Sequence, residues 1–327
     1  MKKLFLALLL GATTLSSFAQ VTDKEKAVRA QSKDTLDGWN LGGMISITGA
    51  QSTFTNWNAG GVNSIALNGL LNYHANLKKG NATWENNFTV GYGLIRQGNK
   101  NASWIKSDDR LNFYSKYGQK ASEHWYYAGL MDFMTQMTPG YNYPNDSVVI
   151  SRFMAPGYLL SAIGMDYKPS KSFSMFVAPI TGKYTFVNDD TLANAGAFGV
   201  DPAEFDAFGT MITPGKKFRA ELGGYLKLRY EQKFPLNEEK ERQNISFSTS
   251  LSLFSNYLNN PERIDVNWDV FAQVQLWKKI TLTLATNLIY DDDVNIAVDE
   301  DGDGTDDAFG PRLQFKQVFG IGITYEF

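Results

Sequence analysis

The chain has 327 residues, with 31 basic and 34 acidic side chains, two histidines and no cysteine. The lack of cysteine excludes disulfide scaffolds, thiolate metal sites and cysteine nucleophiles, and the near balance of charge gives no reason to expect nucleic acid as a partner. With 20% charged residues, the chain also cannot be a multi-span helical membrane protein, which would need several apolar runs of about 20 residues.

The N-terminus has the form of an export signal. Lys2 and Lys3 precede an apolar run over residues 4–10, and small residues lead up to Ala19. This is the secretory pattern, and its apolar run is too short to remain as a membrane span. The sequence predicts a signal peptide over 1–19 with cleavage after Ala19; the alternative is an uncleaved anchor or a buried helix. The charged stretch 20–38 lacks a strand pattern and is expected to be a linker, with a short marginal helix as the alternative.

From residue 39 onward, apolar and polar residues alternate. In 218–231, for example, Leu222 and Leu226 fall on one parity, and Glu221 and Lys227 on the other. A period of two marks a strand with one apolar and one polar face. Segments of this kind lie near 39–50, 62–77, 82–97, 106–117, 123–137, 157–167, 173–187, 217–233, 244–257, 264–276, 279–290 and 313–327.

The lengths of the segments and of their connections favour a membrane barrel. Most segments exceed the roughly 9–11 residues that a tilted strand needs to cross a bilayer. Short and long connections alternate, except that 258–263 is shorter than 234–243, and outer-membrane barrels have short periplasmic turns and long outer loops. The sequence therefore predicts an all-β fold over 39–327, a transmembrane antiparallel up-and-down β-barrel of about 12 strands (range 10–14).

The aromatic residues support this placement. They fall at both ends of the predicted strands, where barrels carry aromatic girdles. One set would lie at the periplasmic end and the other at the outer end: Trp84, Trp125, Tyr127, Tyr167, Tyr230, Tyr325 and Phe327, then Tyr92, Phe218, Tyr257 and Tyr290. A secreted β-sandwich would also alternate, but it requires neither girdles nor an even strand count. The predicted location is the outer membrane of a Gram-negative bacterium, with 20–38 as a periplasmic linker.

Several stretches resemble an uncharacterised family of outer-membrane β-barrels from Bacteroidota that has no assigned function. They are Ser107-Asp108-Asp109-Arg110, Ser115-Lys116-Tyr117-Gly118, Thr135-Gln136, Pro139-Gly140-Tyr141, Ala155-Pro156-Gly157-Tyr158, Gly164-Met165-Asp166-Tyr167, Ala178-Pro179-Ile180-Thr181-Gly182-Lys183 and Gly310-Pro311-Arg312-Leu313-Gln314-Phe315-Lys316. The resemblance implies export and a barrel and supplies no catalytic or ligand residues. The last segment also resembles the C-terminal recognition strand of outer-membrane proteins, which implies contact between Phe327 and the barrel-assembly machinery, besides the lipid bilayer itself.

The polar faces carry charges of both signs that are expected to point into the lumen. These selectivity candidates are Glu85, Arg110, Lys116, Asp132, Arg219, Glu221, Lys227, Arg229, Glu231, Asp265 and Asp269. They either line a water-filled path for polar solutes or pair across a narrow interior and close it. Twelve strands lie between the filled eight-stranded barrel and the open barrels of sixteen to eighteen strands, so the strand number does not decide between the two.

The acidic stretch 299–307 is the sharpest local motif. Asp299, Asp301 and Asp303 alternate before Gly304 as in the front half of a calcium-binding loop, and Asp307 adds a further carboxylate. The position of the bidentate Glu is occupied by Gly310. The motif predicts Ca²⁺ bound in an extracellular loop, and the alternative is a solvated acidic loop tip. No other cofactor is expected.

The sequence does not favour an enzyme. Outer-membrane hydrolases need a His near a Ser or Asp at the outer rim, whereas His74 and His124 both fall near the predicted periplasmic ends of their strands. The leading hypothesis is therefore a channel or transporter for small polar solutes, whose long outer connections 138–156 and 188–216 gate the lumen. The alternative is a non-transporting barrel that acts through its loops as a surface-binding or envelope-structural module.

Overall fold

A computed structural model describes residues 37–53, 62–98, 101–143, 146–235, 244–277, 280–298 and 308–327. The predicted signal peptide and nearly all of the predicted linker lie outside these residues, and so does the whole acidic stretch 299–307. None of the helices in the described ranges is long and apolar enough to cross a membrane.

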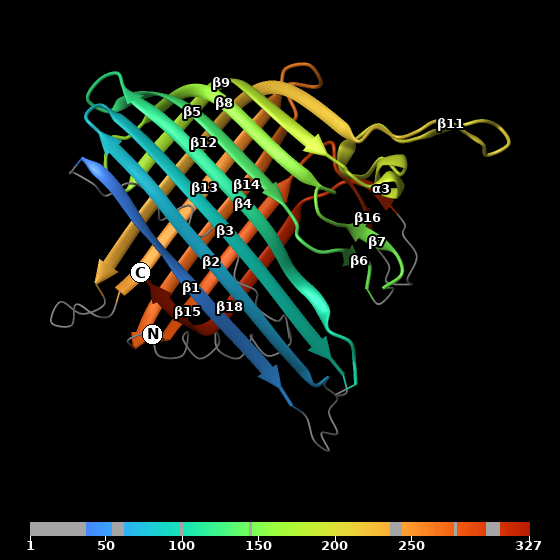
Figure 1. Cartoon of the computed structure of the whole chain (residues 1–327), viewed down its shortest axis with the longest axis horizontal. Helices are drawn as coiled ribbons and strands as arrows, with labels where there is room; N and C mark the ends of the chain where they lie inside the picture. The colour runs from blue at the N-terminus through green and yellow to red at the C-terminus, as the bar shows by residue number, and fades with distance from the viewer. Residues whose placement is uncertain are drawn as a thin grey trace, which may run out of the picture.

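In the described part of the chain, long strands form one closed antiparallel barrel (Figure 1). Its twelve strands are β1 (Gly38–Ser52), β2 (Ser64–Lys79), β3 (Ala82–Gln97), β4 (Ile105–Lys120), β5 (Trp125–Thr135), β8 (Gly157–Tyr167), β9 (Phe173–Phe186), β12 (Phe218–Pro235), β13 (Asn244–Asn256), β14 (Ile264–Trp277), β15 (Ile280–Tyr290) and β18 (Gln314–Glu326). The predicted fold class and strand number are confirmed, and each strand begins and ends within three residues of its predicted range.

The barrel closes where the first strand meets the last. β1 pairs with β18 from Met44 opposite Glu326 to Thr48 opposite Gly322. Gly43 and Phe327 extend this pairing, because the backbone N–H of each donates to the carbonyl of the other at 2.9 and 3.0 Å. This seam joins the two edge strands of the sheet, which would otherwise be open to pairing with another chain. It also places the start of β1 and the C-terminus at the same end of the barrel, called here the terminal end.

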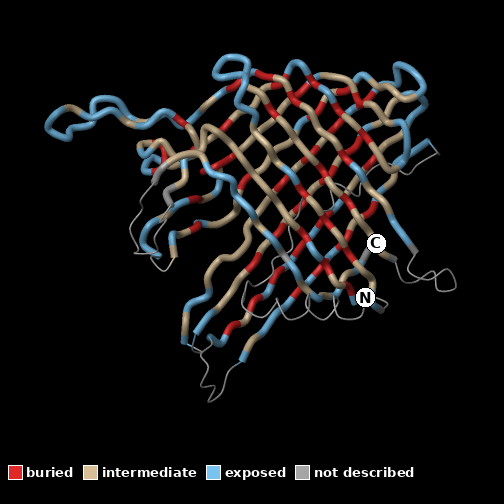
Figure 2. The backbone as a smooth tube through the Cα atoms, turned by 180° about the vertical axis from the view of Figure 1, so that it is seen from behind, coloured by how far each residue is buried: buried red, intermediate tan, exposed pale blue. Residues whose placement is uncertain are grey.

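Burial alternates along the strands with a period of two (Figure 2). In β1, Ser46 and Thr48 are buried, while Ile45 and Ile47 are exposed. Because successive side chains of a strand point to opposite faces, each strand turns its polar face into the lumen and its apolar face outward. The barrel is thus apolar outside and polar over much of its interior, unlike a water-soluble protein.

The longest connections carry short elements of their own. These are β6 (Gly140–Tyr141), β7 (Val149–Ser151), α3 (Asp190–Asn194), η1 (Ala197–Gly199), β10 (Glu204–Phe205), β11 (Met211–Thr213), β16 (Asn295–Val298) and β17 (Ala308–Pro311). They gather at the end opposite the termini, called here the loop end, and the β10–β11 ribbon projects away from the wall (Figure 1). The expected alternation of short and long connections therefore separates the two ends of the molecule.

A β-bulge interrupts β9. Its register shifts against both β8 and β12 around Pro179 and Ile180, so β9 carries one residue more than either neighbour there. Before the bulge Phe176 and Ala178 face inward, and after it the inward parity passes to Thr181. Opposite the bulge, Gly164 of β8 lies directly against the backbone of Val177.

This close approach makes Gly164 sensitive to substitution. A Cβ at Gly164 would collide with the carbonyl oxygen of Val177, whereas a Cβ at Gly129, on the neighbouring strand β5, meets open space. We expect Gly164→Ala to lower the free energy of unfolding by about 1–3 kcal/mol and Gly129→Ala to leave it unchanged or slightly raised. Urea midpoints in lipid vesicles, followed by Trp fluorescence, measure both; equal midpoints would contradict the close approach.

Candidate functional site

Amides and hydroxyls line much of the lumen and bond to one another. Asn72 of β2 donates from Nδ2 to Asn87 Oδ1 at 3.0 Å and to Thr89 Oγ1 at 2.7 Å, both on β3. All three side chains are buried. Such networks satisfy polar groups that the narrow interior removes from bulk water.

A first group of charges, the deep ion-pair cluster, lies toward the terminal end. It consists of Glu85 on β3, Lys116 on β4, Asp166 on β8 and Lys168 directly after β8. Lys116 Nζ lies 2.7 Å from Asp166 Oδ2 and 3.5 Å from Glu85 Oε2. Lys168 Nζ lies 2.7 Å from Glu85 Oε1 and 3.1 Å from Asp166 Oδ2. Because β3 and β8 are not neighbours, these side chains meet through the lumen.

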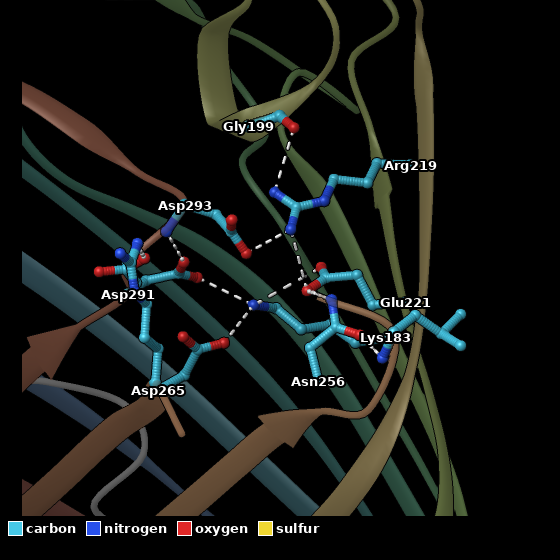
Figure 3. Close-up of polar contacts among 11 residues, drawn as sticks. Lys183, Gly199, Arg219, Glu221, Asn256, Asp265, Asp291 and Asp293 are labelled. Atoms are coloured by element: carbon cyan, nitrogen blue, oxygen red, sulfur yellow. Dashed lines mark hydrogen bonds and ion pairs between the residues drawn. The ribbon is translucent and has the colours of Figure 1, made fainter. Parts of the chain in front are cut away.

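A second group, the rim ion-pair cluster, lies at the loop end and is drawn in Figure 3. It consists of Lys183 on β9, Arg219 and Glu221 on β12, Asp265 on β14, and Asp291 and Asp293 after β15. Lys183 Nζ is the centre of the group, at 2.7 Å from Asp265, 2.9 Å from Asp291 and 3.7 Å from Glu221. Four carboxylates surround two cations, so this end of the lumen has an excess of negative charge.

Arg219 joins two long connections to the wall of the barrel. Its Nη1 donates to the carbonyl of Gly199 at 3.1 Å, and its Nη2 contacts Asp293 and lies 3.1 Å from Glu221 Oε1 (Figure 3). Gly199 belongs to the connection from β9 to β12, and Asp293 to the connection from β15 to β18. One guanidinium therefore holds both connections at the loop end.

The third long connection is held by a carboxylate. Asp109 of β4 accepts hydrogen bonds from the backbone N–H groups of Met137 and Thr138, each at 2.8 Å. It also forms an ion pair with Lys106 at 2.9 Å. Lys106 also donates to the Thr138 carbonyl at 2.8 Å. Each of the three longest connections is thus fixed to the strands through a charged side chain.

An apolar belt of inward-facing side chains lies between the two clusters. Its members are Tyr114, Ala128, Leu130, Ala162, Phe176, Ala178, Tyr225 and Phe254. Along β12, Glu221 of the rim cluster is followed by Tyr225 of the belt and then by Arg229. Lys227 lies over the ring of Tyr114 at 5.0 Å from its centroid, so even the belt carries a cation. Along β12 the belt thus separates the rim cluster from Arg229.

The charged residues singled out from the sequence are distributed over these groups. Glu85 and Lys116 lie in the deep cluster, and Arg219, Glu221 and Asp265 in the rim cluster. Asp132 accepts from Asn112 at 2.7 Å, and Asp269 accepts from Asn287 at 2.7 Å. Arg110 lies 3.2 Å from the sulfur of Met134, and Arg229 lies 3.6 Å from Glu231. A role for any of them in selectivity stays a prediction.

Sequence reasoning missed several members of the clusters. Lys183 was hidden because the bulge at Pro179 reverses the inward parity of β9 before Lys183 is reached. Asp166 was hidden because the inward face of β8 carries Leu160 and Ala162 of the interior apolar packing, which removes the contrast between polar and apolar parities. Asp291 and Asp293 lie outside the regular strands, where the sequence has no alternation of polar and apolar residues that would predict the direction of a side chain.

The structure does not test the calcium prediction. Asp299, Asp301, Asp303 and Asp307 lie outside the described residues. Asp291 and Asp293, from the same connection, form ion pairs with Lys183 and Arg219. Asp292 binds Arg263 at 2.6 Å, and this hydrogen bond raises the pKa of Arg263 above its ordinary value. Within the described ranges, no group of three or more His, Asp or Glu side chains is arranged to hold a metal ion.

The two histidines lie toward the terminal end. His74 Nε2 contacts Asn40 Oδ1 at 3.2 Å, and His124, in the turn between β4 and β5, lies 3.9 Å from Glu123. Neither position is at the loop end.

Comparisons with known proteins add a family match without a function. The profile of a family described as a protein of unknown function, DUF3078, matches residues 50–141, less than half of the chain. No curated protein matches the chain. The predicted origin in Bacteroidota stays a prediction.

Three solved outer-membrane proteins are similar at low level. An outer-membrane channel from Pseudomonas putida F1 has 9% identity and a TM-score of 0.36, covering 96% of this chain and 100% of its own. The NanC porin has 11% identity and a TM-score of 0.36, and the match covers 86% of this chain and 98% of the porin. The translocator domain of the autotransporter NalP from Neisseria meningitidis has 11% identity and a TM-score of 0.34, and the match covers 100% of this chain and 98% of that domain. Similarity this low supports no shared function, and the fold rests on the strand pairing itself.

The burial of the deep cluster predicts a large effect of removing one cation. We expect Lys116→Met to lower the free energy of unfolding by about 3 kcal/mol, because it takes one partner from two buried carboxylates. Lys216→Met is the matched control: the Lys216–Asp201 pair is just as short, at 2.6 Å, but both side chains are 69% exposed. Its urea midpoint should equal that of the wild type. Equal shifts for the two variants would show that the deep pairs add no stability.

Proposed function

We propose that this chain is an exported outer-membrane β-barrel, with the terminal end in the periplasm and the loop end outside the cell. The outward apolar band supports this. Exposed apolar side chains follow the wall on strand after strand: Leu41, Ile45, Ile47, Leu67, Leu71, Met131, Ile163, Val177, Ile180, Leu222, Leu284, Phe319, Ile321 and Ile323. Water-soluble proteins rarely expose apolar surface of this extent, whereas lipid chains cover it.

Aromatic side chains at the two ends of the wall support the same placement. At the terminal end the ring centroids of Trp39 and Trp84 lie 5.9 Å apart, and those of Trp125 and Tyr167 lie 4.7 Å apart. At the loop end Phe218 packs against Phe186 at 5.2 Å. Rings at both boundaries of an apolar band match the girdles of membrane barrels.

The membrane proposal is tested by one charge placed on the wall. Ile47, at mid-height of β1, is 58% exposed, and Ile212 on β11 in a long connection is 65% exposed. In a bilayer, Ile47→Arg should cost about 2–4 kcal/mol and reduce insertion into vesicles, while Ile212→Arg should have no effect. If the wall faced water instead, the two variants would behave alike, since both side chains are equally open.

We propose further that the barrel conducts small polar solutes through its lumen. The observation that carries this proposal is the lining of the closed barrel, where charges and amides face inward along the strands. The rim cluster, with two carboxylates in excess, would favour cations at the outer mouth. Because Arg219 holds two connections at that mouth, its release would widen the opening.

A specific observation favours the alternative, a barrel that transports nothing and acts through its loops. Ion pairs join strands that are not neighbours, and interior side chains such as Thr89, Thr181 and Phe271 are at most 2% exposed. Leu70 of β2 packs with Phe271 of β14 and Ala285 of β15 inside the barrel. These contacts leave a narrow interior, so conduction requires that some of the ion pairs separate.

Planar-bilayer recording distinguishes the two functions. We expect conductance steps from the wild type and a several-fold higher open probability for Arg219→Gln, because Gly199 and Asp293 then lose their common partner. Lys217→Gln is the control, since Lys217 pairs with Asp190 on the surface at 2.7 Å, with both side chains largely exposed. A wild type and Arg219→Gln that are both silent, although folded by heat-modifiable gel mobility, would favour the non-transporting barrel. Steps that Arg219→Gln leaves unchanged would exclude Arg219 as a gate.

A further inference from the structure

Arg229 is a buried cation with unused hydrogen-bond donors. Its side chain is 9% exposed and lies in the lumen on the terminal side of the apolar belt. Within the described ranges, neither Nε nor Nη2 has a hydrogen-bond partner. The closest carboxylate oxygen, Glu231 Oε2, is 3.6 Å from Nη2, which is beyond hydrogen-bond distance.

The two nitrogens without a partner, Nε and Nη2 of Arg229, lie on the same side of its guanidinium group. Nε and Nη2 form one edge of the planar guanidinium, and their N–H groups point the same way, so this edge binds the two oxygens of a carboxylate or phosphate as a fork. A compact ammonium lacks this geometry. Leaving charged donors buried and unpaired costs free energy, so the edge is set up for an acceptor that brings two oxygens.

Serine residues flank Arg229 on the two neighbouring strands. Arg229 stands directly opposite Ser174 of β9 on one side and Ser250 of β13 on the other, and both serines are buried. Ser248, also on β13, is 2% exposed, and its Oγ has no hydrogen-bond partner in the described structure. Ser248 stands opposite Glu231, two residues along the strand from the partner of Arg229, and its free hydroxyl would supply a further hydrogen bond to an oxyanion bound between them.

Apart from Glu231, whose ion pair is with Arg229 itself, the carboxylates nearby are held by other partners. Glu85 and Asp166 are bound by Lys116 and Lys168. Asp269, which lies opposite Ser250, accepts a hydrogen bond from Asn287. These pairings reduce the repulsion that an incoming anion would meet from Glu85, Asp166 and Asp269. Glu231, 3.6 Å from Nη2, would have to move aside or accept the anion next to it.

We propose that the Nε–Nη2 edge of Arg229, together with Ser248, is a lumenal binding site for an oxyanion, the carboxylate or phosphate group of a solute. The proposal deepens the proposed channel function and rests on it in one respect: the group must reach the lumen from one end of the barrel. The rim cluster, rich in carboxylates, is a different site with the opposite charge preference.

Calorimetry on the full mature barrel in detergent tests the site with inorganic phosphate and with acetate as probes, and with chloride as a reference. We expect both oxyanions to bind and chloride to give no saturable heat. Arg229→Lys keeps the charge and loses the fork, and it should weaken binding about tenfold or more, since hydrogen bonds to charged groups are lost. Lys227→Gln removes a neighbouring charge and keeps the fork, so its effect should be clearly smaller.

Three outcomes would overturn the site. The first is no saturable binding of either oxyanion to the wild type, and the second is equal binding by the wild type and Arg229→Lys. The third is equal weakening by Arg229→Lys and Lys227→Gln, which would show that only the overall positive charge of the lumen attracts the anion. Heat-modifiable gel mobility verifies folding, and if Arg229→Lys does not fold, Ser248→Ala serves as the second variant and should also weaken binding.

Equilibrium binding does not require conduction. A silent barrel that binds phosphate would therefore refute the channel alone, and a conducting barrel that does not bind would refute the site alone.

Discussion

The pairing of β1 with β18 is the constraint from which the other features follow. In a lipid environment every backbone N–H and C=O must be bonded within the protein, which a sheet achieves only by closing on itself. Once the sheet is closed, each strand has one face toward the lumen and one toward the outside. The strict alternation of the sequence is the direct consequence, because a slip of one residue would turn every charge toward lipid.

Closure also decides where the charges find partners. The inward parity delivers Lys and Arg together with Asp and Glu into an interior too narrow to hydrate them fully, so they pair through the lumen rather than with water. Lys116 and Lys168 serve the same two carboxylates from different elements. At the loop end the same physics extends beyond the strands, where Lys183 and Arg219 draw Asp291 and Asp293 onto the wall. The conformations of the long connections thus depend on charges that belong to the barrel.

The sequence predicted the barrel well and its charge clusters only in part, for physical reasons. Alternation reports facing wherever the two faces differ in polarity, which is why all twelve strands and the inward Glu85 and Lys116 could be recognised. It fails where a bulge changes the phase, as before Lys183, and where the lumen itself is apolar, as around Asp166. Partners across the lumen depend on curvature and strand order, which a period of two does not encode, so the ion pairs had to come from the structure.

The apolar belt gives the lumen two separate regions of recognition. Along β12, Tyr225 lies between Glu221 of the rim cluster and Arg229. Tyr114 and Phe254 pack in the same belt, so uncharged rings stand between the two charged regions on this side of the barrel. A lumen lined uniformly by paired charges would treat all small ions alike, whereas this one presents carboxylates at the loop end and an unoccupied guanidinium edge nearer the termini. A single strand, β12, already shows this arrangement, because it carries the acidic Glu221, the aromatic Tyr225 and the basic Arg229 in that order from the loop end toward the terminal end.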